Sequence, residues 1–262
     1  MDGNAGKPVA LVTGSSRGIG AAVAVEFAKA GYDIALNFLS SRKEALDIKA
    51  RVEAEGSKAV AIQADVSSLQ DIDRLFEELS DAFDRLDVMV NNAGITRFAP
   101  FLDVTPELFE QLVNTDFRSA FFCSQKAARI MIEKSIKGLI INITSNHQTG
   151  CWPIASVYAS VKAAVSKLTQ NQALELAPYG IRAISIAPGY TQTWKMEDAH
   201  PEKLSKVKTA ERNIPLKRFC QPWEIGKACV FLAGEGASYI TGTCIYMDGG
   251  ALLPVVPENT FS

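Results

Sequence analysis

The sequence is poor in the residues that build metal sites and disulfide frameworks. Its two histidines, His147 and His200, lie far apart and outside any H-E-x-x-H motif, so no catalytic metal site is predicted. Its five cysteines are odd in number and never spaced as C-x-x-C, which argues against both a zinc knuckle and paired disulfides. A reducing compartment is therefore expected.

Long apolar runs and a strong charge imbalance are also lacking. No apolar stretch reaches the ~18 residues of a membrane span. The polar segment Met1–Lys7 lacks the apolar region of a secretory signal. The formal net charge of -2 gives no electrostatic footprint for nucleic acid or an anionic membrane. These absences predict a cytoplasmic protein whose partner is a small molecule.

Short apolar runs alternate with longer amphipathic stretches along the chain. This alternation is typical of a parallel sheet covered by helices on both faces. Within the amphipathic stretch Leu69–Phe83, the apolar residues recur at helical spacing. The predicted strands are Val9–Thr13, Ile34–Phe38, Ala59–Gln63, Val88–Asn91, Leu139–Thr144, Arg182–Ala187 and Thr243–Met247.

The chain shows no linker and no internal repeat, and its 262 residues suit one large α/β domain. We therefore predict a single Rossmann-type, doubly wound domain over residues 1–262. The segment from Gly189 to Pro215 has no clear strand or helix period, and residues 191–215 are expected to form a substrate-binding lid.

A glycine cluster stands between the first predicted strand and the helix after it. Glycines at such a turn let the backbone approach a pyrophosphate, which then meets the N–H groups of the helix N-terminus. The βαβ context predicts a dinucleotide site here. The loop residues expected to contact the cofactor are Gly14, Ser16, Arg17, Gly18, Ile19 and Gly20.

The segment after the second predicted strand bears on the choice of cofactor. An NAD site usually has a carboxylate about 20 residues after the glycine loop, where it holds the ribose 2′-hydroxyl. Residues 37–42 contain no carboxylate, while Arg17, together with Arg42 or Lys43, supplies positive charge for a 2′-phosphate. NADP(H) is therefore expected to be preferred, with NAD(H) as the alternative. Asn37, Phe38 and Ser40 are expected to line this part of the site.

The segment Tyr158-Ala-Ser-Val-Lys162 places a phenol and an ammonium four residues apart. Residues at this spacing share one face of a helix. A free phenol ionises at about pH 10, and a neighbouring cation stabilises the phenolate. This pairing predicts a proton donor and acceptor that works near neutral pH, as an alcohol/ketone oxidoreductase requires.

These motifs, in this order, closely resemble those of the classical short-chain dehydrogenase/reductase family. The resemblance covers nearly the whole chain. It comprises Thr13-Gly14-x-x-x-Gly18-x-Gly20, Asp65-Val66, Asn91-Asn92-Ala93-Gly94, Asn114, Ser145, Tyr158-x-x-x-Lys162, Pro188-Gly189 and Asp248-Gly249-Gly250.

The resemblance implies a role for each matching residue. Tyr158 is the catalytic acid/base, Lys162 holds the nicotinamide ribose, and Ser145 orients the substrate oxygen. Asn114 sits at a helix irregularity and holds a water that relays protons to Lys162. The further cofactor contacts that it implies are Asp65, Val66, Asn91, Ala93, Gly94, Pro188, Gly189, Thr191 and Thr193, and it also implies a homotetramer with the apolar tail 252–256 at an interface.

The substrate pocket is expected beyond the carboxyl ends of the strands. Residues in such positions are aromatic with several polar groups, which suits a polar, ring-shaped or acyl substrate. His147 is the candidate for contact with a substrate hydroxyl. The candidate substrate residues are Phe98, Ser145, His147, Trp152, Tyr190 and Trp194.

Two branches of the family and one non-enzymatic function compete. The 3-oxoacyl-carrier-protein reductases usually carry arginines for carrier docking where this chain has Ile136 and Tyr179. Glucose dehydrogenase-like enzymes are resembled by Ser145-Asn-His147-Gln and by the tail that starts at Gly250. A small polyol or sugar-like substrate is therefore favoured. A non-catalytic NADP(H)-binding sensor is the remote alternative. Such proteins typically lose the tyrosine or the lysine, whereas this chain keeps both Tyr158 and Lys162.

Overall fold

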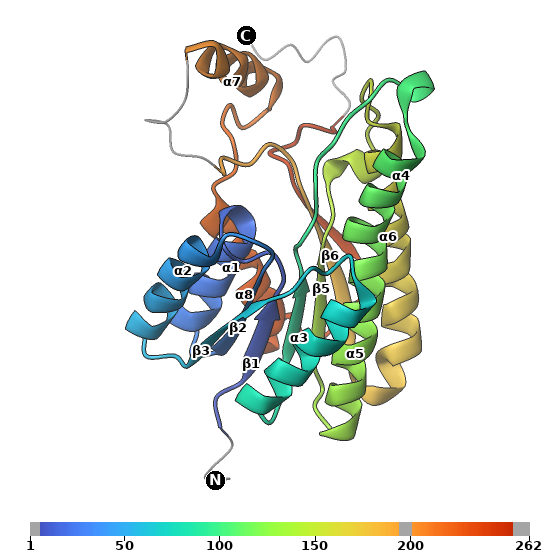
Figure 1. Ribbon diagram of the computed structural model, residues 1–262. Helices are drawn as coiled ribbons and strands as arrows, with labels where there is room; N and C mark the ends of the chain where they lie inside the picture. Colours follow the sequence, from blue (N-terminus) through green and yellow to red (C-terminus); the bar gives the residue numbers. More distant parts are fainter. Residues whose placement is uncertain (1–5, 194–200, 254–262) are drawn as a thin grey trace.

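The protein is seen in a computed structural model that describes residues 6–193 and 201–253. Seven parallel strands form one sheet in the order β3-β2-β1-β4-β5-β6-β7, with helices on both faces (Figure 1). The predicted doubly wound α/β fold is therefore confirmed. The strands are β1 Val9–Val12, β2 Asp33–Phe38, β3 Ala59–Gln63, β4 Val88–Asn91, β5 Leu139–Ile143, β6 Arg182–Pro188 and β7 Cys244–Met247.

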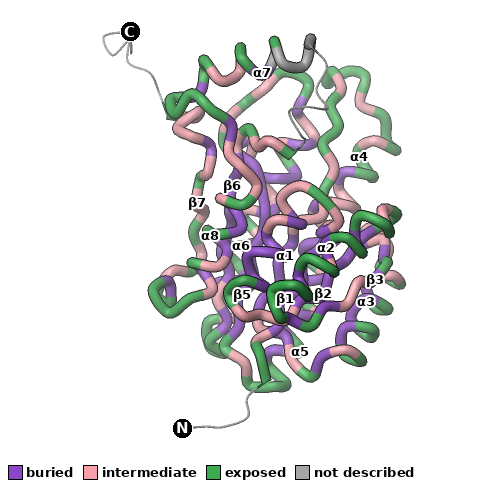
Figure 2. The backbone as a smooth tube through the Cα atoms, turned by 90° about the vertical axis from the view of Figure 1, so that its left-hand side faces the viewer, coloured by how far each residue is buried: buried purple, intermediate pink, exposed green. Residues whose placement is uncertain are grey.

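Alternate residues of the strands from β1 to β6 serve two separate cores, because successive side chains point to opposite faces of a sheet. Ala10 and Val12 pack with helices α1 Gly18–Lys29, α2 Arg42–Ala54 and α8 Pro222–Ala233. Val9 and Leu11 pack with the helices of the other face, which are α3 Leu69–Ala82, α5 Ser119–Glu133 and α6 Ser156–Leu176. Figure 2 shows the buried strands at the centre of the molecule.

The strand order reverses direction beside β1, where β2 lies on one side and β4 on the other. In an open sheet, such a switch point leaves a crevice at the carboxyl ends of the strands. The glycine loop follows β1, and the segments after β4, β5 and β6 reach the same edge. The fold therefore gathers the predicted site residues at one end of the sheet.

Residues 201–213 are more regular than the sequence pattern indicated. Helix α7 spans Pro201–Asn213 and lies at the top of Figure 1, above the end of the sheet. The sequence pattern showed no clear helix period for these residues. A helix period needs a row of apolar residues, and this helix is polar. Among its residues whose burial is described, Val207 and Ala210 join a small cluster with Ile214 and Phe219.

Candidate active site

The glycine loop is packed too closely for side chains. A Cβ at Gly20 would lie 2.4 Å from Nδ2 of Asn92 and 2.5 Å from the carbonyl of Gly14. Gly14 has φ of 61°, a left-handed conformation that favours glycine. Asn92 Nδ2 donates to the carbonyls of Thr13 and Gly14, at 2.8 and 3.1 Å, and so fixes the loop.

Helix α1 begins directly behind this loop and presents a site for an anion. Arg17 occupies the N-cap and makes no side-chain capping hydrogen bond, and the first turn has no acidic residue. The N–H groups of a helix start are unpaired within the helix and attract negative charge. A methyl group at Gly18 would touch Thr193, so this part of the chain closes over the loop. These features fit the pyrophosphate of a dinucleotide.

Asn37 braces the loop from the end of β2. Its Oδ1 accepts a hydrogen bond from the Gly14 N–H at 3.2 Å. Its Nδ2 donates to the carbonyl of Ala64 at 3.0 Å and weakly to that of Ile62. The side chain is buried and its polar atoms are used within the protein. Asn37 therefore holds the backbone of the glycine loop in place.

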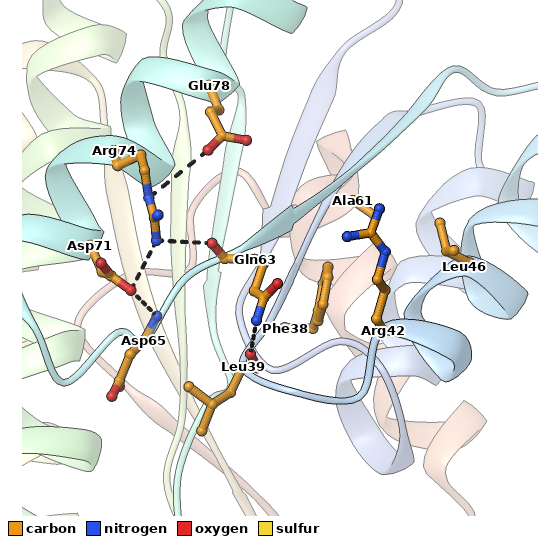
Figure 3. Close-up of a pocket in the computed structure, with 10 residues that line it drawn as sticks. All are labelled: Phe38, Leu39, Arg42, Leu46, Ala61, Gln63, Asp65, Asp71, Arg74 and Glu78. Carbon is orange, nitrogen blue, oxygen red and sulfur yellow. Dashed lines mark hydrogen bonds and ion pairs between the residues drawn. The ribbon is translucent and has the colours of Figure 1, made fainter.

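A pocket of about 560 Å³ opens beside the ends of β2 and β3 (Figure 3). Arg74 in this pocket is paired, since it contacts Asp71 at 3.0 Å and donates to the Gln63 carbonyl at 3.1 Å. Arg42 is exposed, and its side chain has no hydrogen bond or ion pair among the described residues. The lining residues are Phe38, Leu39, Arg42, Leu46, Ala61, Gln63, Asp65, Asp71, Arg74 and Glu78.

Helix α6 positions the phenol and the ammonium at the other end of the crevice. Tyr158 and Lys162 are both buried, and Lys162 Nζ lies 5.7 Å from the centre of the Tyr158 ring. Nζ also contacts Asp116 Oδ2 at 2.9 Å and donates to the Ile143 carbonyl at 3.4 Å. An ammonium has three N–H donors, so one is left for a ligand such as a ribose hydroxyl.

The charge of Lys162 depends on its neighbours. Burial by itself lowers the pKa of this ammonium, but the carboxylate of Asp116 and the phenol of Tyr158 raise it further than burial lowers it. The net pKa of Lys162 therefore lies above its ordinary value, and the residue stays charged in a place without solvent.

Asp116 belongs to a π-helix, Val113–Arg118, between helices α4 Pro106–Leu112 and α5. The Ser119 N–H donates to the Asn114 carbonyl, the longer bond that widens this turn. Asn114 thus lies at a helix irregularity, half-buried, and its side chain makes no hydrogen bond with the described part of the chain. The residue that contacts Lys162 is Asp116.

An aromatic cluster lies beside the phenol. The His147 ring stacks on Trp152 with centroids 4.0 Å apart and on Phe98 at 6.0 Å. The same ring meets the Tyr158 ring edge-on at 5.3 Å. His147 Nδ1 lies 3.1 Å from Ser145 Oγ, so the predicted catalytic serine, the histidine and the phenol form one group.

The protonation of His147 follows from its surroundings. Nδ1 lies 3.3 Å from Asn146 Oδ1, an acceptor, as well as close to Ser145 Oγ. The contact with the Asn146 acceptor favours the tautomer that carries its proton on Nδ1, which leaves a lone pair on Nε2. Burial lowers the pKa of His147, which keeps the ring neutral at neutral pH.

Comparisons with known proteins agree with this geometry. A family model described as enoyl-(acyl carrier protein) reductase matches residues 14–251. The chain belongs to the short-chain dehydrogenase/reductase family. It is 39% identical to the oxidoreductase YohF of Escherichia coli, over 94% of this chain and 96% of that protein. It is 36% identical to the 3-oxoacyl-[acyl-carrier-protein] reductase FabG of Staphylococcus aureus, over 92% and 96%.

A solved structure, acetoin dehydrogenase from Enterobacter cloacae, is similar over 98% of this chain and 100% of that one, with 38% identity and a TM-score of 0.87. The predicted family and fold are thus confirmed. As a family member, the chain is a nicotinamide-dependent oxidoreductase that acts on CH–OH or carbonyl groups. Among the described residues, no helix could span a membrane and no group of side chains could hold a metal ion.

Other residues predicted from the family motifs, or as substrate contacts, lie in varied settings. Asn91 is buried at the end of β4, and its Nδ2 donates to Ser124 Oγ and Asn142 Oδ1, each at 2.8 Å. Tyr190 stacks on Phe219 with centroids 5.1 Å apart. Thr191 Oγ1 donates to the Gly189 carbonyl at 3.2 Å. Trp194 lies outside the described residues, as does most of the predicted interface tail.

The remaining predicted cofactor residues lie at or after the carboxyl ends of the strands. Asp65 accepts a hydrogen bond from the Ser67 N–H at 2.9 Å, and Val66 behind it is buried. Ala93 receives support from Thr13, whose Oγ1 accepts its N–H at 3.0 Å. Gly94 is close-packed, because a Cβ there would lie 2.7 Å from Asp116. Ser16 is half-buried, Ile19 packs on the α1 core, Ser40 is exposed, and Pro188 ends β6.

Sequence reasoning missed three residues that shape this site. Asp116 is the partner of Lys162, Asn92 clamps the glycine loop, and Asn142 joins Asn91 to Thr169 and Gln172 of α6, at 2.8 and 2.9 Å. Only Asn92 gave a signal, as part of the Asn-Asn-Ala-Gly motif. The other two pair with residues distant in the chain, which no local spacing reveals.

Proposed function

We propose that the protein is an NADP(H)-preferring oxidoreductase that interconverts a secondary alcohol and a ketone on a small polar substrate, with Tyr158 as acid/base. The observation that carries this proposal is the grouping of Tyr158, Lys162, Ser145 and His147 at the end of the crevice. It contains a titratable hydroxyl, a buried cation and a second hydroxyl donor, which together suit proton exchange with a substrate oxygen.

Each side chain has a distinct part in the reaction. In alcohol oxidation, the phenolate of Tyr158 takes the carbinol proton, and in ketone reduction the phenol returns it. The Ser145 hydroxyl lies 3.1 Å from His147 Nδ1 and makes only a long hydrogen bond to Asn146 Oδ1, at 3.5 Å, so it can turn to donate to the substrate oxygen, where negative charge develops. The nicotinamide cofactor, when bound, supplies or accepts the hydride.

His147 indicates the class of substrate. Its Nε2 is an acceptor without a hydrogen-bond partner among the described residues, and its ring lies against the catalytic phenol. An acceptor at this place suits a hydroxyl next to the reacting carbon. We infer an α-hydroxyketone or vicinal diol, which belongs to the small polyol-like class expected from the sequence. Acetoin is itself an α-hydroxyketone, so the similarity to the acetoin dehydrogenase of Enterobacter cloacae supports this choice.

Arg42 supports the preference for NADP(H). Among the described residues it is the exposed, unpaired cation of the pocket beside β2. Two of the three carboxylates in the pocket, those of Asp71 and Glu78, contact Arg74, and the third, Asp65, accepts the Ser67 N–H. A 2′-phosphate placed there meets an available guanidinium, which suits bidentate contact with phosphate oxygens.

The alternative is a 3-oxoacyl-carrier-protein reductase, supported by the similarity to FabG. A carrier protein needs a basic docking surface beside the site. Ile136 is partly buried in the α5 core and Tyr179 is exposed, and both stand where arginines were expected for that function. The hydroxyketone function is therefore the better supported of the two.

The test is to titrate NADPH and NADH separately and then assay a panel of carbonyl compounds. The panel contains acetoin, butan-2-one as its analogue without the hydroxyl, a sugar lactone and a 3-oxoacyl thioester. Acetoin should be reduced faster than butan-2-one, with NADPH favoured over NADH. Tyr158→Phe should lower kcat by about 10²–10⁴-fold. Cofactor binding without turnover of any compound would instead identify a sensor, and preference for the thioester would identify the carrier branch.

His147→Phe separates the substrate class from the reaction type. Phenylalanine keeps the stacking with Trp152 and Phe98 but has no acceptor. The ratio of kcat/KM for acetoin to that for butan-2-one should fall by roughly threefold to tenfold, as for one lost hydrogen bond. An unchanged ratio would contradict the role of Nε2.

We also propose a cytoplasmic homotetramer. All five cysteines are free, which suits a reducing compartment. Helices α5 and α6 expose large apolar side chains, among them Phe121, Ile132 and Leu174, and such patches mark contact surfaces between subunits. Light scattering on the purified protein tests the assembly, and a monomeric mass at micromolar concentration would contradict it.

A further inference from the structure

A short loop between β3 and α3, residues 65–68, borders the pocket shown in Figure 3, and Asp65 is part of the pocket lining. Asp65 Oδ1 accepts the Ser67 N–H at 2.9 Å, whereas Oδ2 makes no hydrogen bond with the described part of the chain. A carboxylate oxygen can only accept. Asp65 Oδ2 is therefore available to a donor in the pocket, and the amino group of adenine is such a donor.

Two side chains hold this loop from opposite directions. From α3, Asp71 Oδ2 accepts the Asp65 N–H at 2.7 Å and contacts Arg74 at 3.0 Å (Figure 3). From the π-helix, Nη2 of Arg118 donates to the carbonyl of Ser67, which lies 51 residues earlier in the chain. Asp71 belongs to the helix that the loop itself begins. Arg118 therefore ties the loop to a separate element of the fold.

Arg118 occupies a place that is unfavourable for a guanidinium. Its Nε is buried and has no hydrogen-bond partner among the described residues. A buried donor without a partner destabilises a fold, and methionine would fill the same space with no such donor. A guanidinium has five N–H donors, and within the described ranges one of them is used, in the bond to the Ser67 carbonyl. That bond is therefore what the guanidinium contributes.

The element that carries Arg118 is a firmer base than the loop. Helix α5 continues directly from the π-helix, and its Cys123 and Ala127 are fully buried against the sheet. In the loop, by contrast, Val66 is the buried residue, and the residues on either side of it are partly exposed. A hydrogen bond from Arg118 therefore fixes the loop relative to the sheet.

We propose that Arg118 is a positioning residue for the adenosine half of the cofactor. By holding the Ser67 carbonyl, its guanidinium orients the Asp65 carboxylate toward the place of the adenine amino group. This inference rests on the proposed function, because it takes the bound molecule to be NADP(H). Arg118 acts through the loop and not by contact with the cofactor. An acceptor that is already oriented loses less freedom when the nucleotide binds, which strengthens binding.

The experiment compares two nucleotides that differ in one donor. NADPH carries the amino group of adenine, whereas deamino-NADPH carries hypoxanthine, which has an oxygen at that position. Both affinities are measured by cofactor fluorescence without substrate. Wild-type protein should bind NADPH about threefold to tenfold more tightly than deamino-NADPH, as for one hydrogen bond. In Arg118→Met, this ratio of affinities should fall toward one.

Three further variants isolate the hydrogen bond to Ser67. Arg118→Gln has its amide nitrogen at the position of Nε and ends short of the Ser67 carbonyl, so the ratio should fall as in Arg118→Met. Arg118→Lys keeps a long charged donor and should retain more of the ratio than either. Arg51→Met removes an exposed guanidinium from α2 and should leave the ratio unchanged.

A folded Arg118→Met or Arg118→Gln protein with the wild-type ratio would overturn the proposal, because a merely structural role weakens the binding of both nucleotides alike. If Arg118→Met does not fold, Arg118→Gln decides, since it keeps a polar group in the buried place. Asp65→Ala should also lower the ratio, and adding Arg118→Met to it should lower the ratio no further, because both changes act on the same contact. A further fall in the double variant would contradict the proposed path through Asp65.

The measurement needs no turnover, so it separates this inference from the proposed function. A protein that binds NADPH but reduces no carbonyl compound would contradict the proposed function, while the ratio of affinities would still decide the role of Arg118. A wild-type protein that binds both nucleotides equally well would overturn this inference and leave the role of Tyr158 untouched.

Discussion

The two ends of the crevice treat their cations differently. At the catalytic end, Lys162 is buried, and an ion pair and a backbone carbonyl hold it in place. At the other end, Arg42 is exposed and has no partner in the part of the chain that the structure describes. The first arrangement preorganises a charge for chemistry. The second leaves a charge available to a ligand. Substitutions at the catalytic end should therefore change both activity and unfolding free energy, whereas substitutions at the other end should change cofactor binding alone.

The largest effect is expected from Lys162→Met. It removes the cation beside Tyr158, so kcat should fall by about 10²–10⁴-fold. It also leaves Asp116 as an unpaired buried charge, which should cost about 3–5 kcal/mol of unfolding free energy in urea denaturation. Lys134→Met is the matched control, since its partner Asp84 is 94% exposed, and it should change neither quantity measurably. Equal losses of kcat and of unfolding free energy in Lys162→Met and Lys134→Met would contradict the special role of the buried lysine.

Asn142→Leu should lower the unfolding free energy, although Asn142 does not contact the reacting groups. Asn142 is fully buried and hydrogen-bonds Asn91, Thr169 and Gln172 behind the catalytic end. Leucine leaves these partners unsatisfied, at about 1–3 kcal/mol for each group. Urea unfolding measures the loss. Asn171 is exposed on α6, the helix of Thr169 and Gln172, so Asn171→Leu should not lower the unfolding free energy comparably. An Asn142→Leu protein as stable as the wild type would refute the role of this network.

Arg42→Ala sharpens the comparison from the opposite end. Loss of one charged contact to a phosphate should raise the KM for NADPH roughly tenfold, with the KM for NADH unchanged. The unfolding free energy should not change, because Arg42 has no partner to lose. Arg51→Ala, at the far end of α2, is the control and should alter neither cofactor. A parallel rise in both KM values would show that Arg42 does not distinguish the cofactors.

The smallest effect concerns acid stability. Burial lowers the pKa of His147 in the folded protein. In the pH range between that lowered pKa and the unfolded pKa of about 6.5, the unfolded chain therefore binds more protons than the folded protein. The contribution of neutral His147 is thus present above about pH 6.5 and is lost as the pH falls. His147→Gln should make the decrease in Tm between pH 7 and pH 5 shallower. A steeper decrease in the variant would contradict this sign.

The sheet was predictable because its central strands are buried on both faces and its edge strands still carry short apolar runs. Val88–Asn91 and Ala59–Gln63 begin and end where their apolar runs do, and the other strands differ by a residue at an end. Helix α7 was not predictable, since a polar helix lacks the apolar row that marks a period. Within the site, the placement of Tyr158 and Lys162 on one face of a helix was predictable from their spacing. Asp116 was not, because its contact depends on how the π-helix packs against α6.

The π-helix makes α4, Val113–Arg118 and α5 one unbroken rod from Pro106 to Glu133 with a single widened turn. Each helical residue rotates the chain by about 100°. Deleting one residue within that turn would therefore swing the carboxylate away from its lysine while α5 kept its seat on the sheet. The number of residues in this turn is therefore constrained as strictly as the identity of its side chains. An alignment gap misplaced by one position here would assign the carboxylate's place to the wrong residue.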